Sequence, residues 1–244
     1  MTAGGLAVAA DERVLNAIAA SRLGRLSHQR LERVLAGSRI RRDPAGALVR
    51  PIGEGGSHVE LVVSGLVRAE VSSPDGRSLA IRYAPPGSLL GVASLFGEPY
   101  TMPGSLHALT DSTLLELRPE VVRRVALEDL AVASALLDEL SDRVLGFVGE
   151  IPGSAFTTVR QRIARHLLTV ATEQPGSGAL VARISQQQLA DAVGTVREVV
   201  VRELRGLREE GVVETGSRSI TIVHPERLLA DISEATPADW NPGS

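Results

Sequence analysis

The sequence predicts an α+β protein in which an N-terminal antiparallel β-barrel or jelly roll precedes a long helix and a small helical domain with a β-hairpin. Three observations support this order. Short apolar runs alternate with Gly, Pro, Asp and Ser between residues 48 and 117. An apolar heptad repeat covers residues 130–151, and two short helices, a tight turn and a hairpin are expected over residues 184–222.

The N-terminal part is expected to contain helices before the strands begin. Residues 1–11 are mostly small and are expected to be disordered, whereas apolar residues recur at helical spacing over residues 11–39. The candidate strands are residues 48–52, 60–64, 66–72, 78–84 and 113–117. Pro74-Asp75-Gly76 predicts a hairpin turn between the third and the fourth of them.

A heptad seam is predicted along the helix that follows Pro119. Its apolar residues are separated alternately by three and four positions: Leu130, Ala133, Leu137, Leu140, Val144, Phe147 and Ile151. This spacing is typical of two helices packed side by side, and therefore predicts a homodimer. The alternative is one helix that packs on its own barrel. Pro152-Gly153-Ser154 predicts the helix end and a hinge, and Thr158 is expected to cap the next helix, over residues 160–172.

Two short helices around Gly194 form the most informative part of the chain. Ser185 is a good N-cap, and Thr195 is expected to cap the second helix. The first helix is expected to bury Leu189, Ala192 and Val193. The second is expected to bury Val196, Val200, Leu204 and Leu207. A hairpin with a Gly-Ser tip is expected over residues 212–222.

The opposite face of the second helix carries Arg197, Glu198, Arg202 and Arg205. Arginine can bond guanine O6 and N7, and glutamate can accept from the cytosine amino group. A polar stripe is also common on any solvated helix, but cap, turn, stripe and hairpin in this order indicate a winged helix-turn-helix that reads duplex DNA. Arg197, Glu198 and Arg202 are expected to contact bases. The phosphate candidates are Ser185, Gln187, Thr195, Arg205 and Arg218.

The run from Val193 to Leu204 resembles a known DNA-binding motif. It reads V-G-T-V-R-E-V-V-V-R-E-L, which is similar to the pattern V-G-x-[ST]-R-E-x-V-x-R-x-L of the cAMP receptor protein and fumarate-nitrate reduction regulator (CRP/FNR) superfamily. The resemblance covers roughly residues 12–225. It implies a TGTGA-like half-site in a palindrome and a contact with RNA polymerase.

The cyclic-nucleotide cassette of that family is altered in this chain. The family reads P-G-x-x-x-G-E and then R-[ST]-A, where Glu holds the ribose hydroxyl and Arg holds the cyclic phosphate. Here Val92 stands at the position of the Glu, and Gly104 at that of the Arg. Phe147 and Val148 replace hydroxyl side chains that contact adenine. The family's mode of cAMP binding is therefore not expected, because a desolvated phosphate would lose its charged partner.

The identity of any effector is left open by these residues. The candidate pocket consists of Arg82, Gly91, Val92, Ala93, Gly104, Ser105, Phe147 and Val148. Its apolar character favours an apolar or amphiphilic ligand, a cyclic dinucleotide bound differently, or a filled pocket without a ligand. Arg82 can still supply an anion contact. Haem with His107 as its axial ligand is a further alternative.

Composition excludes several other classes of protein. The chain lacks cysteine, so disulfides, cysteine-ligated zinc and cysteine-held iron–sulfur clusters are excluded. Its formal net charge is −3, so DNA affinity must come from the local placement of arginines, and its 2% aromatic content argues against base-stacking modules. No catalytic or metal-ligating motif is found, so neither an enzyme nor a cofactor is expected. Without a signal-peptide pattern or an apolar run of membrane-spanning length, the expected location is the cytoplasm and no membrane partner is expected.

The expected organisation has four parts. Residues 1–128 form a sensor domain, residues 129–152 a dimerisation helix, residues 153–228 the winged helix-turn-helix and residues 229–244 a tail. The expected function is a homodimeric transcriptional regulator that binds double-stranded DNA in a sequence-specific way. The alternative is a ligand- or haem-binding sensor or scaffold whose DNA-reading face is not used.

Overall fold

The computed structural model describes residues 11–72, 78–97, 101–156, 158–174, 179–216 and 218–233. The chain divides into two compact units, residues 1–144 and 145–244. The expected turn at Pro74–Gly76, the hairpin tip at Ser217, and residues 1–10 lie outside the described residues. So do the side chains of Phe147, Val148 and Ile151, although their backbone is helical.

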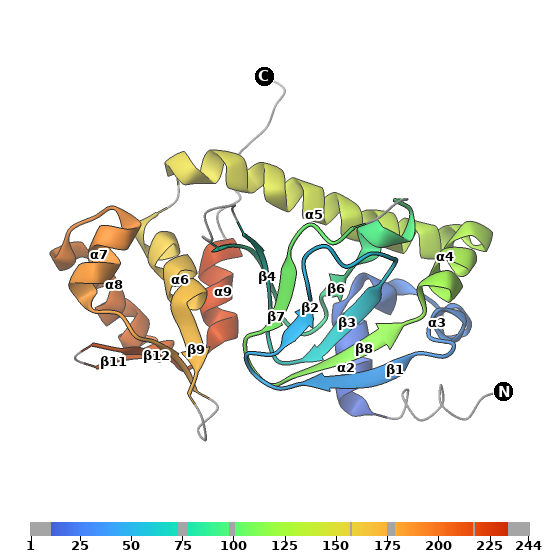
Figure 1. Ribbon diagram of the computed structural model, residues 1–244, viewed down its shortest axis with the longest axis horizontal. Coiled ribbons are helices and arrows are strands. Elements are labelled where there is room, and N and C mark those ends of the chain that lie inside the picture. The colour runs from blue at the N-terminus through green and yellow to red at the C-terminus, as the bar shows by residue number, and fades with distance from the viewer. Residues whose placement is uncertain are drawn as a thin grey trace. The chain divides into compact units, whose positions relative to one another are not determined.

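Two antiparallel four-stranded sheets form the roll of the first unit (Figure 1). One sheet has the order β1 (Arg39–Asp43), β8 (Ser112–Leu117), β3 (Val59–Ser64), β6 (Leu89–Leu90). The other has the order β2 (Leu48–Arg50), β7 (Ser105–Ala108), β4 (Val67–Ser72), β5 (Ser78–Ala84). All five predicted strands are present, four of them with shifted ends, so the predicted antiparallel roll is confirmed.

Strands β1, β6 and β7 were not predicted. Strand β1 consists of Arg39–Asp43 and has four charged residues out of five, so it lacks the apolar alternation that marks a strand. Ion pairs hold it instead, because Arg39 and Arg41 both donate to Glu116 on the neighbouring β8. Strand β6 has only two residues, too few to show a pattern.

Two apolar cores stabilise the first unit. One lies between the first sheet and the helices α2 (Glu12–Ala20), α4 (Pro119–Glu128) and the start of α5 (Leu130–Phe156). The short helices η1 (Arg22–Arg25), α3 (His28–Val34) and η2 (Val92–Leu95) border this core. The other core fills the space between the two sheets. Successive side chains of β3 point into different cores. Leu61 and Val63 face the helices, while Val62 faces the interior of the roll.

Helix α5 runs from Leu130 to Phe156, so the predicted end at Pro152-Gly153-Ser154 is wrong. Proline removes one backbone N–H donor, and the other donors of this 27-residue helix still sustain helical backbone beyond it. The first half of α5 lies along the roll, against which it buries Val132, Ala135 and Leu136 (Figure 1). None of the described helices is long and apolar enough to cross a membrane.

The second unit begins with α6 (Val159–Val170), whose predicted cap is confirmed. The Thr158 side chain accepts from the Gln161 N–H, and the Gln161 side chain accepts from the Thr158 N–H. The helix ends before the predicted residue 172, because β9 (Ala171–Glu173) pairs with β10 (Leu180–Ala182). Helices α7 (Gln186–Val193), α8 (Arg197–Glu209) and α9 (Pro225–Ser233) and the hairpin β11–β12 (Val213–Thr215 and Ile220–Ile222) complete it.

Candidate DNA-reading and effector sites

Helix α7 and the turn after it form as the sequence predicts. Ser185 caps α7 by accepting from the Gln188 N–H, and the Gln188 side chain accepts from the Ser185 N–H in return. Gly194 ends the helix in the left-handed conformation, with φ 67° and ψ 50°. Nothing lies within 4 Å of a Cβ built on Gly194, so its backbone conformation, and not crowding, favours glycine there.

Three details of the helix pair differ from the prediction. Helix α8 begins at Arg197 with Val196 at its N-cap, so Thr195 is not the cap. The Thr195 N–H instead donates to the Ala190 carbonyl, which places this residue in the turn. Val196 is 58% exposed because it precedes the first helical turn, and Ala190, not Ala192, belongs to the buried face of α7.

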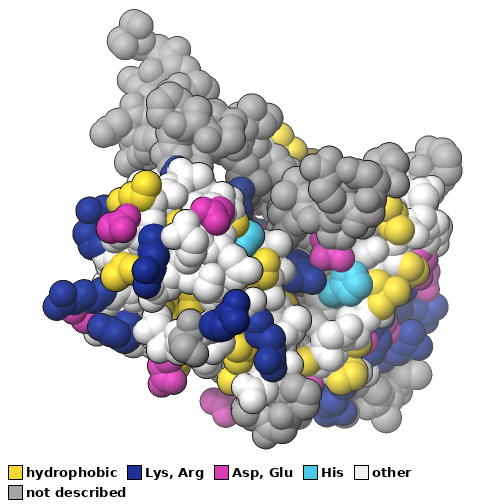
Figure 2. Space-filling model, turned by 60° about the vertical axis from the view of Figure 1, so that its left-hand side comes forward, with side chains coloured by type: hydrophobic (Ala, Val, Ile, Leu, Met, Phe, Trp, Pro, Cys, Tyr) yellow, Lys and Arg dark blue, Asp and Glu magenta, His cyan; other side chains and the backbone are white. Residues whose placement is uncertain are grey.

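The two faces of α8 differ sharply in character. Val200, Leu204 and Leu207 are fully or almost fully buried. The four predicted reading residues, Arg197, Glu198, Arg202 and Arg205, are all exposed. Arginine side chains, coloured dark blue, lie across the face of this unit that Figure 2 presents. The side chains that the sequence singled out are thus available to an external partner.

The exposed residues of α8 are held only by weak contacts. Arg202 donates to Glu203 at 3.2 Å, and Arg205 donates to Glu209 at 2.8 Å. Such exposed ion pairs contribute little stability, so the arginines can exchange them for nucleic acid. Arg197 and Glu198 make no hydrogen bond or ion pair to the described residues.

The predicted phosphate contacts occupy different environments. Gln187 is exposed and its amide donates to Asp191 at 2.9 Å. The Ser185 hydroxyl caps α7 and the Ser185 N–H donates to the Gln188 side chain, so both groups are already engaged at the helix start. Arg218 is exposed, two residues before the start of β12 of the hairpin. Thr195 is half-buried in the turn.

Helix α6 fixes the position of α7 and α8 through two arginines that sequence reasoning missed. Arg160 donates to both carboxylate oxygens of Glu210, at 2.8 and 2.6 Å, and to Asp231 on α9. These carboxylates hold the pKa of Arg160 above its ordinary value. Arg162 donates to the Val193 carbonyl at the end of α7 at 2.8 Å. The start of α6 is therefore tied to the C-terminal end of each helix of the pair.

The interior of the roll is apolar where the family cassette predicts a nucleotide. Its core contains Val49, Val62, Val67, Ala84, Leu90, Met102, Leu106, Ala108 and Leu114. Val92 is fully buried, but in the other core, against the helices. Gly91 is the N-cap of η2, and Ala93 is exposed on that short helix. The Ser105 hydroxyl accepts from the Ile52 N–H at 3.1 Å. Of the predicted pocket residues that the structure describes, Val92, Ala93 and Ser105 thus lie in three different environments.

Gly104 has no space for any side chain. A Cβ built there would lie well inside 3.0 Å of the Glu70 carbonyl oxygen, and 3.1 Å from Val71 Cγ1. Real Cβ atoms do not approach backbone so closely, so an arginine at this position would require the strands to move apart.

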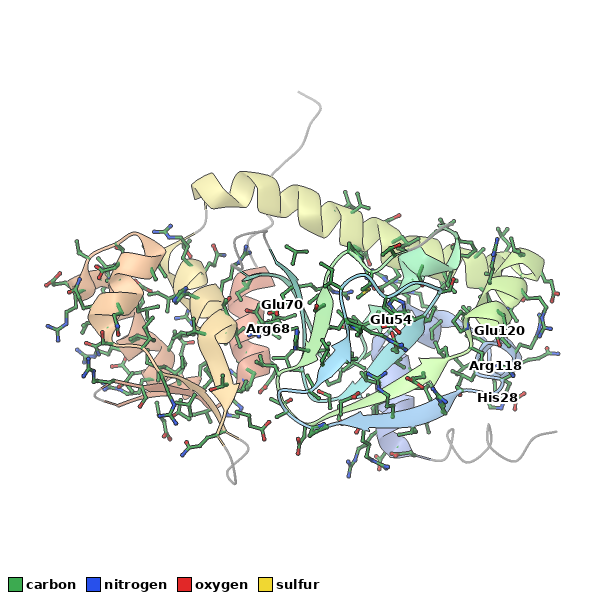
Figure 3. The ribbon with its side chains drawn as sticks, viewed as in Figure 1. His28, Glu54, Arg68, Glu70, Arg118 and Glu120 are labelled. Atoms are coloured by element: carbon green, nitrogen blue, oxygen red, sulfur yellow. The ribbon has the colours of Figure 1, made fainter. Side chains whose placement is uncertain are left out.

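The two candidate cationic residues lie elsewhere in the roll. His107 Nε2 lies 3.2 Å from Glu70 Oε1, and Arg68 lies beside the other oxygen of the same carboxylate (Figure 3). This ring nitrogen, a candidate haem ligand, is therefore already engaged. Arg82 on β5 faces α5, where it lies beside Glu139 and Arg143. Sequence reasoning missed these two partners, although their i, i+4 spacing on the helix face opposite the seam is a usable signal. Among the described residues, no group of three acidic or histidine side chains could hold a metal ion.

The predicted seam residues of α5 are largely uncovered within one chain. Leu130, Leu137 and Val144 are 84%, 60% and 58% exposed. Ala133 is half-buried, and Leu140 partly packs on the first core. A helix that packs only on its own roll would not be expected to expose three large apolar residues at heptad spacing.

Comparison with known proteins agrees with both units. Residues 41–129 match the cyclic nucleotide-binding domain family, and residues 161–230 match the Crp-like helix-turn-helix domain family. The transcriptional regulator LdrP of Thermus thermophilus is 30% identical over 178 residues, which cover 71% of this chain and 87% of LdrP. The CRP-like cAMP-activated global transcriptional regulator of Mycobacterium tuberculosis is 26% identical over 189 residues, which cover 76% of this chain and 84% of that protein.

A solved structure supports the same assignment. The c-di-GMP responsive global regulator CLP of Xanthomonas campestris is 27% identical, with a TM-score of 0.53 over 80% of this chain and 99% of that chain. Both domain families are matched in the order expected, and the named relatives are transcriptional regulators. The chain belongs to the CRP/FNR superfamily of transcriptional regulators.

Proposed function

We propose that this regulator is a homodimer that reads a TGTGA-like palindrome through α8. The observation that carries the proposal is the division of α8 into a buried apolar face and an exposed face with Arg197, Glu198 and Arg202. Arg202 follows Arg197 by five residues, so the helix rises about 7.5 Å between them, or roughly two base-pair steps. These three side chains can therefore reach successive base pairs in one major groove.

The dimer is supported by the apolar stripe on α5. Leu130, Leu137 and Val144 share one face and remain exposed in the single chain, while the opposite face of the helix packs on the roll. Pairing of two such helices would bury this stripe. It would also give two copies of α8, which could enter major grooves about 34 Å apart on one side of the duplex.

The way in which the roll binds its effector is proposed to differ from the family's usual mode of cAMP binding. Gly104 leaves no room for the phosphate-binding arginine, and Val92 packs in an apolar core. Residues 1–128 are proposed to sense another effector, the helix from residue 129 to form the dimer, and the domain up to residue 228 to bind DNA. A contact with RNA polymerase is proposed from membership of the family.

Selection of bound DNA from a random library tests this function. The full chain is incubated with the library, and bound sequences are enriched over several rounds. The expected result is a palindrome with TGTGA-like halves spaced by one helical turn. Loss of all enrichment would contradict the proposal and favour the sensor or scaffold alternative. Enrichment of a single, unpaired half-site would contradict the dimer alone.

A further inference from the structure

An apolar side chain lies in the middle of the charged, exposed face of α8. Val201 is 41% exposed. Arg197 lies four residues before it, Glu198 three residues before it, and Arg205 four residues after it. Residues at these spacings are neighbours on the surface of a helix. Val201 is therefore surrounded by side chains that are themselves exposed and charged.

The stability of α8 does not explain a valine at this position. The buried face of the helix is already formed by Val200, Leu204 and Leu207. On an exposed helix position valine is a poorer helix former than alanine or arginine, because its β-branch restricts the side chain. Single exposed apolar residues are ordinary on a protein surface, but this one interrupts a face whose other long side chains are charged. We therefore expect Val201 to contact the partner of that face.

The major groove of DNA offers one apolar feature that such a side chain can recognise. Valine neither donates nor accepts a hydrogen bond through its side chain, so it cannot pair with the donors and acceptors of the base edges. The C5-methyl group of thymine lies in the major groove, where short apolar side chains contact it. Thymine is the only one of the four bases with this group, so an apolar contact distinguishes a T·A pair from the others.

We propose that Val201 is a specificity residue that contacts the C5-methyl group of a thymine beside the G·C pair read by Arg202. The proposal rests on the DNA-reading function proposed above and deepens it, because it assigns a T·A pair to a residue of α8. Val201 precedes Arg202 by one residue, a rise of about 1.5 Å, which is less than one base-pair step of about 3.4 Å. The two side chains can therefore reach adjacent base pairs. In a TGTGA-like half-site a T·A pair lies on each side of both G·C pairs, so a thymine is available there.

Replacement of thymine by deoxyuridine tests the contact without any change to the protein, because the two bases differ only in the C5-methyl group. Fluorescence anisotropy gives the affinity of the full chain for the selected palindrome and for versions with one thymine of one half-site replaced at a time. Replacement at one position at least should weaken binding about fourfold, the effect of losing one buried methyl group. If no replacement weakens binding by the wild type, the proposal is overturned.

Val201→Ala shows whether Val201 makes this contact. Alanine is the better helix former, so the variant should keep α8 folded. It should bind the thymine and deoxyuridine versions equally at the position that the wild type distinguishes. Val223→Ala is the matched control, since Val223 is 42% exposed in the same unit but follows β12, outside α8. This control should keep the fourfold difference, and a fourfold difference that persists in Val201→Ala would overturn the proposal.

5-Methylcytosine provides a test in the opposite direction. The sensitive T·A pair is replaced by C·G, and cytosine is compared with 5-methylcytosine at that position, so that again only a methyl group differs. The wild type should bind the methylated version several-fold more tightly, and Val201→Ala should bind both versions equally. Equal binding of the two versions by the wild type would contradict a methyl contact.

These measurements separate the new contact from the DNA-reading function itself. If selection enriches no palindrome, the DNA-reading function fails and the contact fails with it. If a palindrome is enriched but its thymines are read equally well by the wild type and by Val201→Ala, the assignment of Val201 alone is wrong.

Discussion

Gly104 shows how one residue allows close packing in the roll. Its backbone lies against the Glu70 carbonyl oxygen of β4, in the space that a side chain would need. The missing arginine is therefore part of a closer approach of two strands and not an isolated change. An arginine side chain at this position would require a different path for the backbone.

Gly104→Ala is accordingly expected to destabilise the protein by about 1–3 kcal/mol, because overpacking against backbone forces the strands apart. Gly55→Ala is the matched control, since nothing lies within 4 Å of a Cβ at Gly55 and its φ is not positive. Urea unfolding monitored by circular dichroism measures both. Equal midpoints for Gly104→Ala and the wild type would show that the strands are not in close contact.

His166 on α6 gives the second unit a pH dependence. Burial lowers the pKa of His166 below its ordinary value of 6.5, so the folded state binds this proton less tightly than the unfolded state. The resulting stability is present above pH 6.5 and is lost as the pH falls through the lower, folded-state pKa. His166→Gln should reduce the dependence of the thermal midpoint on pH over this range. An unchanged slope of the midpoint against pH would assign the acid sensitivity to other groups.

At the scale of elements, α5 has one apolar face that packs on the roll and another that is exposed in the single chain. Val132, Ala135 and Leu136 pack on the roll, whereas Leu137 and Val144 are exposed. A seam residue can therefore be changed without damage to the fold of its own chain. Leu140 is less suitable, because it partly packs on the first core.

Leu137→Glu should convert the dimer to a monomer, since two carboxylates would face each other across the seam without a partner. Leu127→Glu on α4 is the control, because Leu127 is 74% exposed and lies outside the seam. Sedimentation velocity distinguishes the two species, and circular dichroism verifies folding. A Leu137→Glu variant that still sediments as a dimer would rule out this face.

At the scale of the whole molecule, local signals were the predictable ones. Ser185, Gly194 and Thr158 shape their own turns or helix ends, so sequence alone located them. Contacts between distant residues were missed, because nothing in the sequence pairs Arg143 with Leu89, 54 positions away. The same holds for β1, whose charged residues become a strand only because Glu116 is available to them.

The architecture also separates the part that was easy to predict from the part that was not. The helix pair repeats a dense motif, and the exposure of its polar side chains followed from their spacing. The interior of the roll depends on close packing at Gly104 and on the Arg82–Glu139–Arg143 cluster, which only the three-dimensional structure reveals. The exposed face of α8 was therefore predictable in more detail than the interior of the roll.

The central claim is that the exposed face of α8 reads bases, and Arg202→Ala tests it most directly. Affinities of the full chain are measured by fluorescence anisotropy for the selected palindrome and for variants with each base pair changed. Arg208→Ala is the control, an exposed arginine in the last turn of the same helix. Arg202→Ala should cost about 1–3 kcal/mol and abolish the preference at one G·C pair of each half-site, while Arg208→Ala leaves every preference intact. Equal weakening on all sequences by Arg202→Ala would contradict the claim and make Arg202 a phosphate contact.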